Sequence, residues 1–145
     1  MSKSFKIKTY IDGKEKYPGI YGYPPTQLFI TIDPIVYDID TGDRKLQFSV
    51  PRNFPFDGAS VPKTFWVTTG HPLSAPFIRA ALLHDCLYRY NEGGHGKAMA
   101  DKLFYEILRA DGVGWYTAKK MYRAVCWFGG STWRKWRRLN DGVKE

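Results

Sequence analysis

Cysteine is scarce in this sequence, and acidic residues are fewer than basic ones. Only Cys86 and Cys126 occur among 145 residues, which is too few for a disulfide-stabilised scaffold. We expect both to be buried free thiols, because free cysteine is among the most often buried residue types. Lys and Arg number 22 against 14 Asp and Glu, which gives a net charge of +8. This surplus predicts an anionic partner such as a phosphate-rich surface or a nucleic acid.

Long hydrophobic runs are also missing. No apolar stretch approaches the roughly 20 residues that a membrane-spanning helix needs, so we expect no transmembrane segment. Residues 1–6 lead into an alternating pattern and not into the apolar stretch of a secretory signal. We therefore expect synthesis in the cytoplasm without a signal peptide, so that any action outside the cell requires a separate carrier.

The first part of the chain has the patterns of β-strands. Alternation of apolar and polar residues, or enrichment in Ile, Val, Phe and Tyr, marks three strand-like segments, residues 5–11, 28–38 and 44–50. Residues 40–43 (Asp-Thr-Gly-Asp) form a turn between the last two, which predicts a hairpin. Proline and glycine interrupt residues 17–25 and 51–62, and we expect both segments to be loops.

The second part has the spacing of helices. Helical periodicity covers residues 74–90, 97–110 and 115–128, and the short basic segment 131–139 is a candidate fourth helix. Asp111-Gly112 and Gly129-Gly130 are typical helix ends. Strands followed by helices predict an α+β fold. We expect a single domain, residues 1–145, with a β-rich part (1–56), a helical part (57–130) and a basic, aromatic C-terminal segment (131–145).

Polar residues stand among apolar ones in the first predicted helix. His84 and Tyr88 are four residues apart and share a face, whereas Asp85 is rotated by about 100° from His84. His84 and Asp85 can therefore point into one cleft while contacting different partners. Burial of the Asp85 carboxylate among leucines is costly without a partner, so we expect a cation or hydrogen bonds there. The alternative is an ordinary helix whose polar residues reach solvent.

Two further acidic positions can complete a site. Asp101 on the second helix can accept the Nδ1–H of His84, which is how a histidine base is usually oriented, and Tyr88 can donate to the same carboxylate. Asp101 can instead simply complement the helix dipole. Asp57-Gly58 offers a carboxylate and a backbone carbonyl, a mixture that binds calcium, although Asp-Gly is also a common turn.

These motifs resemble those of the secreted bacterial and fungal phospholipases A2. The matching residues span roughly positions 57–130 and comprise Asp57-Gly58, His84-Asp85-x-x-Tyr88 and Asp101-x-x-Phe104-Tyr105. The resemblance implies that His84 activates a water molecule and that Asp101 and Tyr88 orient it. It also implies calcium as the cofactor, with Asp85, Asp57 and the Gly58 carbonyl as ligands, and stabilisation of the ester oxyanion by the metal.

The chain departs from those enzymes at a disulfide. They link the calcium loop to the helix through two cysteines, and Ala59 and Ala81 stand at the corresponding positions here. Absence of this link fits a protein made in a reducing compartment.

A broader set of motifs is similar to small phage- and prophage-encoded proteins of unassigned function. This second resemblance covers most of the chain and includes Asp57-Gly58-Ala59-Ser60-Val61-Pro62, Trp66, His84-Asp85, Tyr88 and Ala100-Asp101-x-x-Phe104. It implies that the protein can be carried in a phage particle.

The leading hypothesis is calcium-dependent hydrolysis of a phospholipid ester, or a domain descended from such an enzyme. A non-enzymatic alternative is a virion or tail accessory protein in which the His–Asp cluster joins two helices. A lesser alternative is a metal-dependent phosphohydrolase of the HD type. The order of His71, His84-Asp85 and Asp101 or Asp111 resembles the metal ligands of that family. Zinc binding by His71, His84 and His95 lacks any recognised short spacing.

The C-terminal segment combines tryptophan with positive charge. Its candidate partner-binding residues are Trp133, Arg134, Lys135, Trp136, Arg137 and Arg138. They suit a helix lying on anionic lipid or, less well in our judgement, nucleic-acid phosphates with base stacking. Another virion protein is a further possible partner. The alternative is a helix that the two tryptophans anchor to the core.

Overall fold

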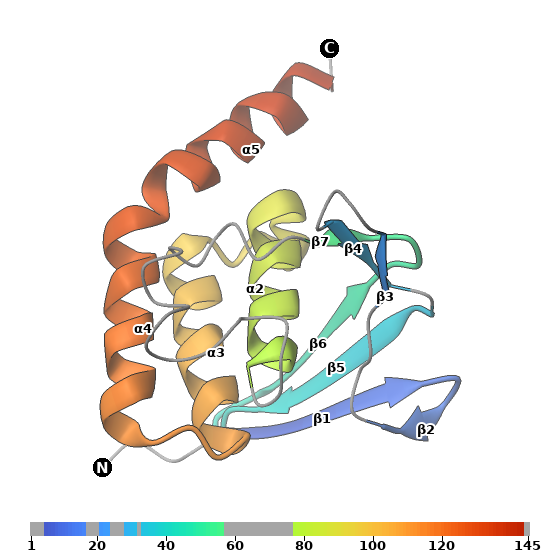
Figure 1. The fold of residues 1–145 in the computed structure, drawn as a ribbon, viewed down its shortest axis with the longest axis vertical. Coiled ribbons are helices and arrows are strands. Elements are labelled where there is room, and N and C mark those ends of the chain that lie inside the picture. The colour runs from blue at the N-terminus through green and yellow to red at the C-terminus, as the bar shows by residue number, and fades with distance from the viewer. Residues whose placement is uncertain (1–4, 17–20, 24–27, 32, 57–76, 144–145) are drawn as a thin grey trace.

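The computed structural model describes residues 5–16, 21–23, 28–31, 33–56 and 77–143. Strands in the first part of these residues precede helices in the second, so the fold is α+β, as predicted (Figure 1). The helices are α2 (Ile78–Tyr90), the short 3₁₀ helix η1 (Glu92–Gly94), α3 (Lys97–Ala110), α4 (Trp115–Phe128) and α5 (Gly130–Val143).

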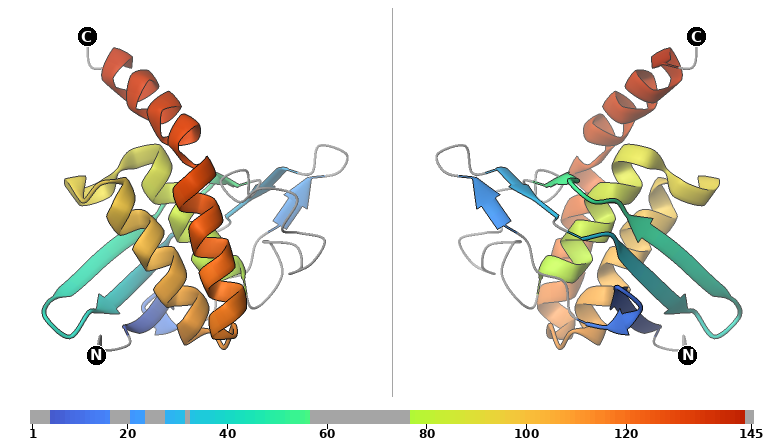
Figure 2. Two further views of the ribbon diagram at one scale, coloured as in Figure 1. Left: turned by 90° about the vertical axis from the view of Figure 1, so that its left-hand side faces the viewer. Right: turned by 90° about the vertical axis from the view of Figure 1, so that its right-hand side faces the viewer.

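The strands form two antiparallel sheets. The larger sheet has the order β2 (Lys14–Glu15), β1 (Lys6–Ile11), β5 (Ile35–Asp40), β6 (Lys45–Val50). The smaller has the order β3 (Tyr21–Tyr23), β4 (Leu28–Ile30), β7 (Pro55–Phe56). The side views show the β5–β6 hairpin on one side of the helices and β3–β4 on the other (Figure 2).

The predicted hairpin is confirmed. β5 and β6 pair with Asp40 opposite Lys45, and the loop is closed by a hydrogen bond from the Thr41 N–H to the Arg44 carbonyl (3.0 Å). Gly42 has φ = +91°, which its lack of a side chain permits. Alternate residues of β5 are buried, and one of them, Tyr37, stands opposite Phe48. One face of the larger sheet therefore faces the core.

The sequence prediction of one strand over residues 28–38 is wrong. The chain leaves β4 after Ile30 and enters β5 at Ile35, so the two halves belong to different sheets. Pro34 lies between them and has no N–H to donate to a ladder. The buried Thr31 hydroxyl donates to the Pro51 carbonyl (2.7 Å) and accepts the Phe54 N–H (3.0 Å). These bonds stabilise the crossing.

Two predicted loops contain short strands. β3 lies within residues 17–25, and β7 lies within residues 51–62. Both are two or three residues long and pair with β4. Local sequence favours turns at such proline- and glycine-rich segments, and pairing with a distant strand overrides that preference.

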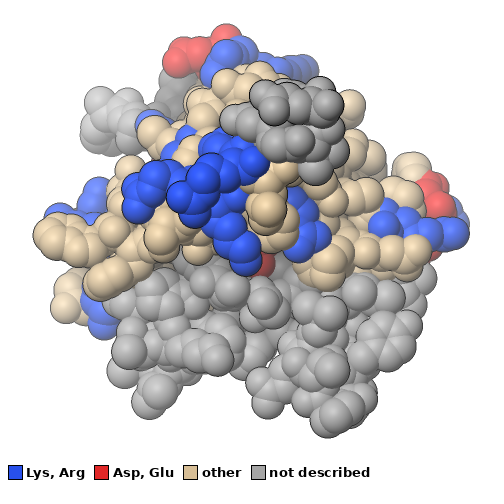
Figure 3. Space-filling model, turned by 90° about the horizontal axis from the view of Figure 1, so that it is seen from above, with Lys and Arg blue, Asp and Glu red and all other residues tan. Residues whose placement is uncertain are grey.

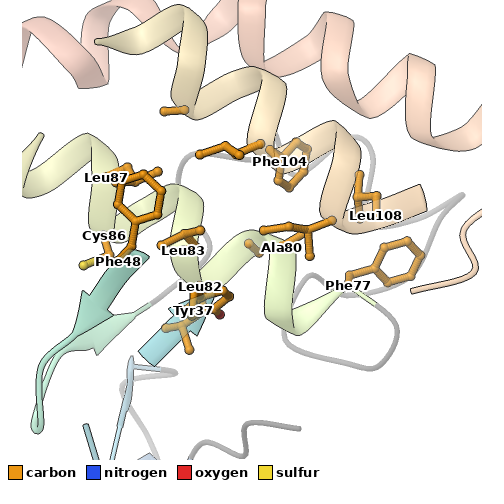
Figure 4. Packing of buried hydrophobic residues seen from close by; sticks show 14 of the residues in the cluster. Tyr37, Phe48, Phe77, Ala80, Leu82, Leu83, Cys86, Leu87, Phe104 and Leu108 are labelled. Carbon is orange, nitrogen blue, oxygen red and sulfur yellow. The ribbon is translucent and has the colours of Figure 1, made fainter. Parts of the chain in front are cut away.

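The helical core is built around α2. Its side chains Leu82 and Leu83 pack between Tyr37 of the sheet and Phe104 of α3 (Figure 4). The predicted bounds of α3 and α4 agree with the structure, and α2 covers the described part of the first predicted helix. The predicted helix 131–139 lies inside α5, which begins at Gly130. The C-terminal end of α5 projects beyond the other helices (Figure 1).

The two cysteines differ in exposure. Cys86 is a buried free thiol, as expected, and burial raises its pKa to about 12. Cys126, in the last turn of α4, is exposed, so the expectation that both are buried is wrong. Among the described residues, no helix has the length and apolar character to cross a membrane.

A buried ion pair ties α2 to the end of α3. The Arg79 guanidinium contacts the Asp111 carboxylate, and both side chains are about nine-tenths buried or more. The same guanidinium approaches the Ile7 carbonyl of β1 (3.4 Å), and the Arg79 carbonyl accepts the Tyr37 hydroxyl (2.8 Å). One residue of α2 therefore connects the sheet with the turn after α3.

We predict that Asp111→Asn strongly destabilises the protein, because it leaves a buried guanidinium without its counter-charge. The expected loss is roughly 3 kcal/mol of unfolding free energy. The control is Asp33→Asn, which breaks the exposed Arg52–Asp33 pair (3.9 Å) and is expected to cost less than about 1 kcal/mol. Urea unfolding measures both variants. Equal losses would contradict the structural role of the buried pair.

Candidate active site

Helix α2 is buried along nearly its whole length. Every residue from Ile78 to Tyr88 is buried except Asp85, which is partly exposed. The His84 side chain has no exposed surface. The alternative in which the polar residues of this helix simply reach solvent is therefore wrong for His84 and Tyr88. Helical geometry turns Asp85 about 100° away from its neighbour, toward the accessible side.

The buried polar groups of α2 converge on one carboxylate. His84 Nε2 lies 2.7 Å from Asp101 Oδ1, and the Tyr88 hydroxyl donates to the same oxygen at 2.6 Å. Asp101 projects from α3 and is itself buried. Asp101 therefore does more than complement the helix dipole, because it accepts two buried hydrogen bonds from α2. The structure brings together His84, Tyr88 and Asp101, the three side chains that the sequence analysis groups.

The nitrogen that contacts Asp101 differs from the predicted one. The sequence predicts donation by the Nδ1–H of His84, whereas the structure has Nε2 next to the carboxylate. Asp101 lies on the neighbouring helix, and Nε2 is the ring nitrogen farthest from the histidine's own backbone, so it reaches across. In the neutral tautomer that donates through Nε2, Nδ1 is the basic nitrogen.

Lys97 is a fourth member of the cluster that the sequence analysis missed. Its ammonium donates to Asp101 Oδ2 (2.7 Å) and to the carbonyls of Val125 (3.4 Å) and Cys126 (3.2 Å) in the last turn of α4. Its side chain is 24% exposed. The signal in the sequence is the spacing of Lys97 and Asp101, four residues apart on one helix. Through Lys97 the carboxylate joins α2, α3 and α4.

The charges of the cluster are set by burial and by these bonds. Burial alone raises the pKa of the Asp101 carboxyl, but hydrogen bonds from His84, Lys97 and Tyr88 outweigh it and hold the pKa below its usual value. Burial lowers the pKa of His84, although Asp101 partly opposes this. Burial and the Asp101 carboxylate raise the pKa of Tyr88. The site therefore holds an ionised Asp101, a neutral His84 and a neutral Tyr88.

The backbone at the α4–α5 junction packs directly against the Tyr88 side chain. A Cβ atom added at Gly129 would collide with the Tyr88 hydroxyl and with the Val125 carbonyl. The Trp133 ring meets the Tyr88 ring edge-on, with centroids 5.3 Å apart. Gly129 is thus required for close approach, which its place in the sequence as a helix end does not reveal.

Some predicted ligands lie outside the described residues. Asp57, Gly58 and His71 are among them. Ala59, at one position of the missing disulfide, also lies outside the described residues. Asp111 pairs with Arg79 at the opposite end of α3 from Asp101, and the ring of His95 packs against Phe48. The described residues hold no group of three His, Cys, Asp or Glu side chains suited to a metal ion. Asp85 provides a partly exposed carboxylate of the kind calcium prefers.

The C-terminal segment is partly used for packing. Arg137 donates to the Tyr88 and Arg89 carbonyls at the end of α2 (2.5 and 2.9 Å), and it stacks on the Trp133 ring. Arg89 in turn stacks on Trp136, 4.2 Å from the ring centroid. Cationic side chains at a helix C-terminus satisfy its last carbonyls. The exposed members of the predicted surface are Arg134, Lys135 and Arg138.

Comparison with known proteins defines the family. Residues 32–125 match the family described as "Protein of unknown function (DUF1353)", and the chain belongs to that family. The match includes all four residues of the buried cluster and Asp85, and it ends before α5 begins.

One similar protein is "Uncharacterized protein y4jT" of Sinorhizobium fredii. It is 32% identical over an alignment of 117 residues, and the match covers 77% of this chain and 34% of the relative. The chain thus spans about a third of the length of that relative. No solved structure matches the chain.

We predict that acid destabilises the protein through this cluster. The folded pKa values of His84 and Asp101 both lie below their usual values, so the unfolded chain binds more protons as the pH falls. The unfolding free energy should therefore decrease between about pH 7 and pH 4. Urea unfolding at several pH values measures it. An unfolding free energy that increases as the pH falls from 7 to 4 would show that folded His84 is a cation.

Substitution at Gly129 tests the close packing on Tyr88. Gly129→Ala should lower the unfolding free energy by about 1–3 kcal/mol, because the new methyl group overpacks the site. Tyr88→Phe removes the hydroxyl that the methyl group meets. In a Tyr88→Phe background, Gly129→Ala should therefore lower the unfolding free energy by less than it does in the wild type. Gly114→Ala is the control, since nothing lies within 4 Å of its added Cβ. Strictly additive losses would contradict a direct contact.

Proposed function

We propose that the protein hydrolyses a phospholipid ester with the help of calcium, and that His84 is the water-activating base. One observation carries this proposal: Asp101 Oδ1 accepts both the His84 Nε2–H and the Tyr88 hydroxyl, at 2.7 and 2.6 Å. This arrangement fixes the ring, and in the tautomer that donates through Nε2 the basic nitrogen is Nδ1. The resemblance of the motif order to secreted phospholipases A2 supports the choice of substrate.

The chain's own residues explain how the base works. Nδ1 of neutral His84 takes a proton from water as the water attacks the ester carbonyl. The imidazolium that forms is stabilised by the adjacent Asp101 carboxylate, which stays ionised. It then gives the proton to the alcohol oxygen of the ester as the carbon–oxygen bond breaks, so that a fatty acid and an alcohol are released. Tyr88 and Lys97 hold Asp101 in place and satisfy its two oxygens. The low pKa of His84 keeps it in the basic form at neutral pH.

Calcium fits the acidic residue next to the base. Asp85 follows His84 on α2 and is the partly exposed residue of its buried stretch. Asp57 and the Gly58 carbonyl are the further ligands of this proposal. Bound there, calcium supplies positive charge for the ester oxygen that becomes negative during attack.

A second candidate function is structural. The complete burial of the His84 side chain and the bonds from Lys97 to α4 carbonyls suit a cluster that joins three helices. In that case the protein is a non-enzymatic component, for example of a phage particle, and the cluster stabilises its fold.

Fatty-acid release from phospholipid vesicles distinguishes these functions. We expect release by the wild-type protein in calcium and none with a chelator. His84→Gln should reduce the rate by about 100-fold or more, as loss of a general base does, and Asp85→Asn should abolish calcium-dependent release. The control Asp43→Asn makes the same change at an exposed hairpin residue and should retain the wild-type rate.

Stability of the same variants completes the test. Each variant must be shown to be folded by its circular dichroism and urea unfolding before its rate is compared. Absence of release by folded wild-type protein in calcium, across neutral and anionic phospholipids, would reject the hydrolytic function and favour the structural one.

A further inference from the structure

Positive charge is concentrated in α4 and α5. Residues 115–140 contain seven Lys and Arg residues and no Asp or Glu: Lys119, Lys120, Arg123, Arg134, Lys135, Arg137 and Arg138. The whole chain has a net charge of +8, so this segment accounts for most of the excess. Seen from above, where α5 lies, Lys and Arg side chains gather on the surface (Figure 3). Such a surface attracts an anionic partner.

Two large aromatic side chains are exposed in the middle of this segment. Trp127 is 82% exposed and Phe128 is 61% exposed, in the last turn of α4. Arg123 lies four residues before Trp127 and is exposed on the same face. A Cβ atom added at Gly130 would lie 3.1 Å from the Arg134 guanidinium, so that cation lies against the junction as well.

The tryptophans of α5 do not provide this surface. Trp133 contacts Tyr88, and Trp136 stacks on Arg89, so both serve to fasten α5 to α2. Six other exposed residues of the two helices make up what we call the α4–α5 patch. Its members are Arg123, Trp127, Phe128, Arg134, Lys135 and Arg138.

The α4–α5 patch adjoins the candidate site. The carbonyl of Cys126, the residue before Trp127, accepts a hydrogen bond from Lys97 of the buried cluster. Gly129, the residue after Phe128, packs on the Tyr88 hydroxyl. A partner that binds Trp127 and Phe128 therefore lies close to the residues that position His84.

We propose that the α4–α5 patch docks on the surface of an anionic phospholipid bilayer. Trp127 and Phe128 enter the interface between headgroups and acyl chains, and the surrounding cations contact lipid phosphates. Aromatic side chains favour this interface, and clustered Lys and Arg are attracted to anionic lipid. The proposal extends the proposed function, because it names the form in which the substrate is presented, although docking itself needs no hydrolysis.

The arrangement of the aromatic residues favours lipid over nucleic acid. Neighbouring residues on a helix point about 100° apart, so the two rings do not offer parallel faces to successive bases as single-strand-binding proteins do. Both rings can nevertheless enter a fluid interface together. Their apolar surface gains most from an environment that removes it from water.

Vesicle co-sedimentation of the full chain tests the docking. Wild-type protein should bind vesicles rich in phosphatidylglycerol and bind pure phosphatidylcholine weakly, with affinity for the anionic vesicles falling as salt rises. Trp127→Ala should weaken binding roughly tenfold. The triple variant Arg134→Gln, Lys135→Gln, Arg138→Gln should weaken it by about 100-fold at low salt.

Matched controls replace similar exposed residues elsewhere. Trp115→Ala removes a 58% exposed tryptophan at the other end of α4, and Lys14→Gln, Arg44→Gln, Lys45→Gln removes three exposed cations of the larger sheet and its hairpin. Both controls should bind like the wild type. Equal losses of vesicle binding in the controls and in the patch variants would overturn the proposal. It would also be overturned if the protein does not bind vesicles but binds a single-stranded oligonucleotide through the patch.

Hydrolysis of a dissolved short-chain phospholipid separates this proposal from the proposed function. The patch variants should retain the wild-type rate on that monomeric substrate and lose rate on vesicles. Protein that binds anionic vesicles through the patch without any hydrolysis would reject the proposed function and leave the docking supported. Protein that hydrolyses the dissolved substrate without binding vesicles would reject the docking alone.

Discussion

The ionised carboxylate of Asp101 is the interaction on which the helical half depends. A buried charge is tolerated only when it is fully hydrogen-bonded and paired. Here His84 and Tyr88 of α2 contact one oxygen, and Lys97 of α3 contacts the other while also bonding to α4 carbonyls. The spacing of three helices is thereby tied to a single side chain.

This arrangement links stability to chemistry. The proposed base must be held firmly to act on water, and the buried hydrogen bonds of Asp101 hold His84 firmly. The same bonds fasten Tyr88, on which Gly129 and Trp133 pack, so the position of α5 depends on the site as well. Arg137 and the stacked Arg89–Trp136 pair then complete the end of α2. Substitutions in the cluster therefore affect several elements together.

Much of the fold could be predicted from the sequence, because its signals are local. The α3 and α4 bounds follow from apolar spacing and glycine, and the β5–β6 hairpin follows from alternation around Gly42. The division of residues 28–38 between two sheets could not be predicted, because it depends on long-range bonds of Thr31 with Pro51 and Phe54.

The candidate site was predictable in part. The spacing of His84 and Tyr88, together with the apolar neighbours of Asp101, was enough to group these residues. The choice of Nε2 and the role of Lys97 toward α4 depend on how neighbouring helices pack, which spacing within one helix does not contain. Helix packing also decides that Trp127 is exposed whereas Trp133 is partly buried against the core.

Our central proposal is that α2 carries a base, His84, next to a metal ligand, Asp85, and that Asp101 positions the base. Calorimetric titration with calcium tests it most directly, because it requires no choice of substrate. The account predicts that wild-type protein binds calcium and that folded Asp85→Asn does not. Wild-type protein that binds no calcium, or an Asp85→Asn variant that binds it as well as the wild type, would contradict the account.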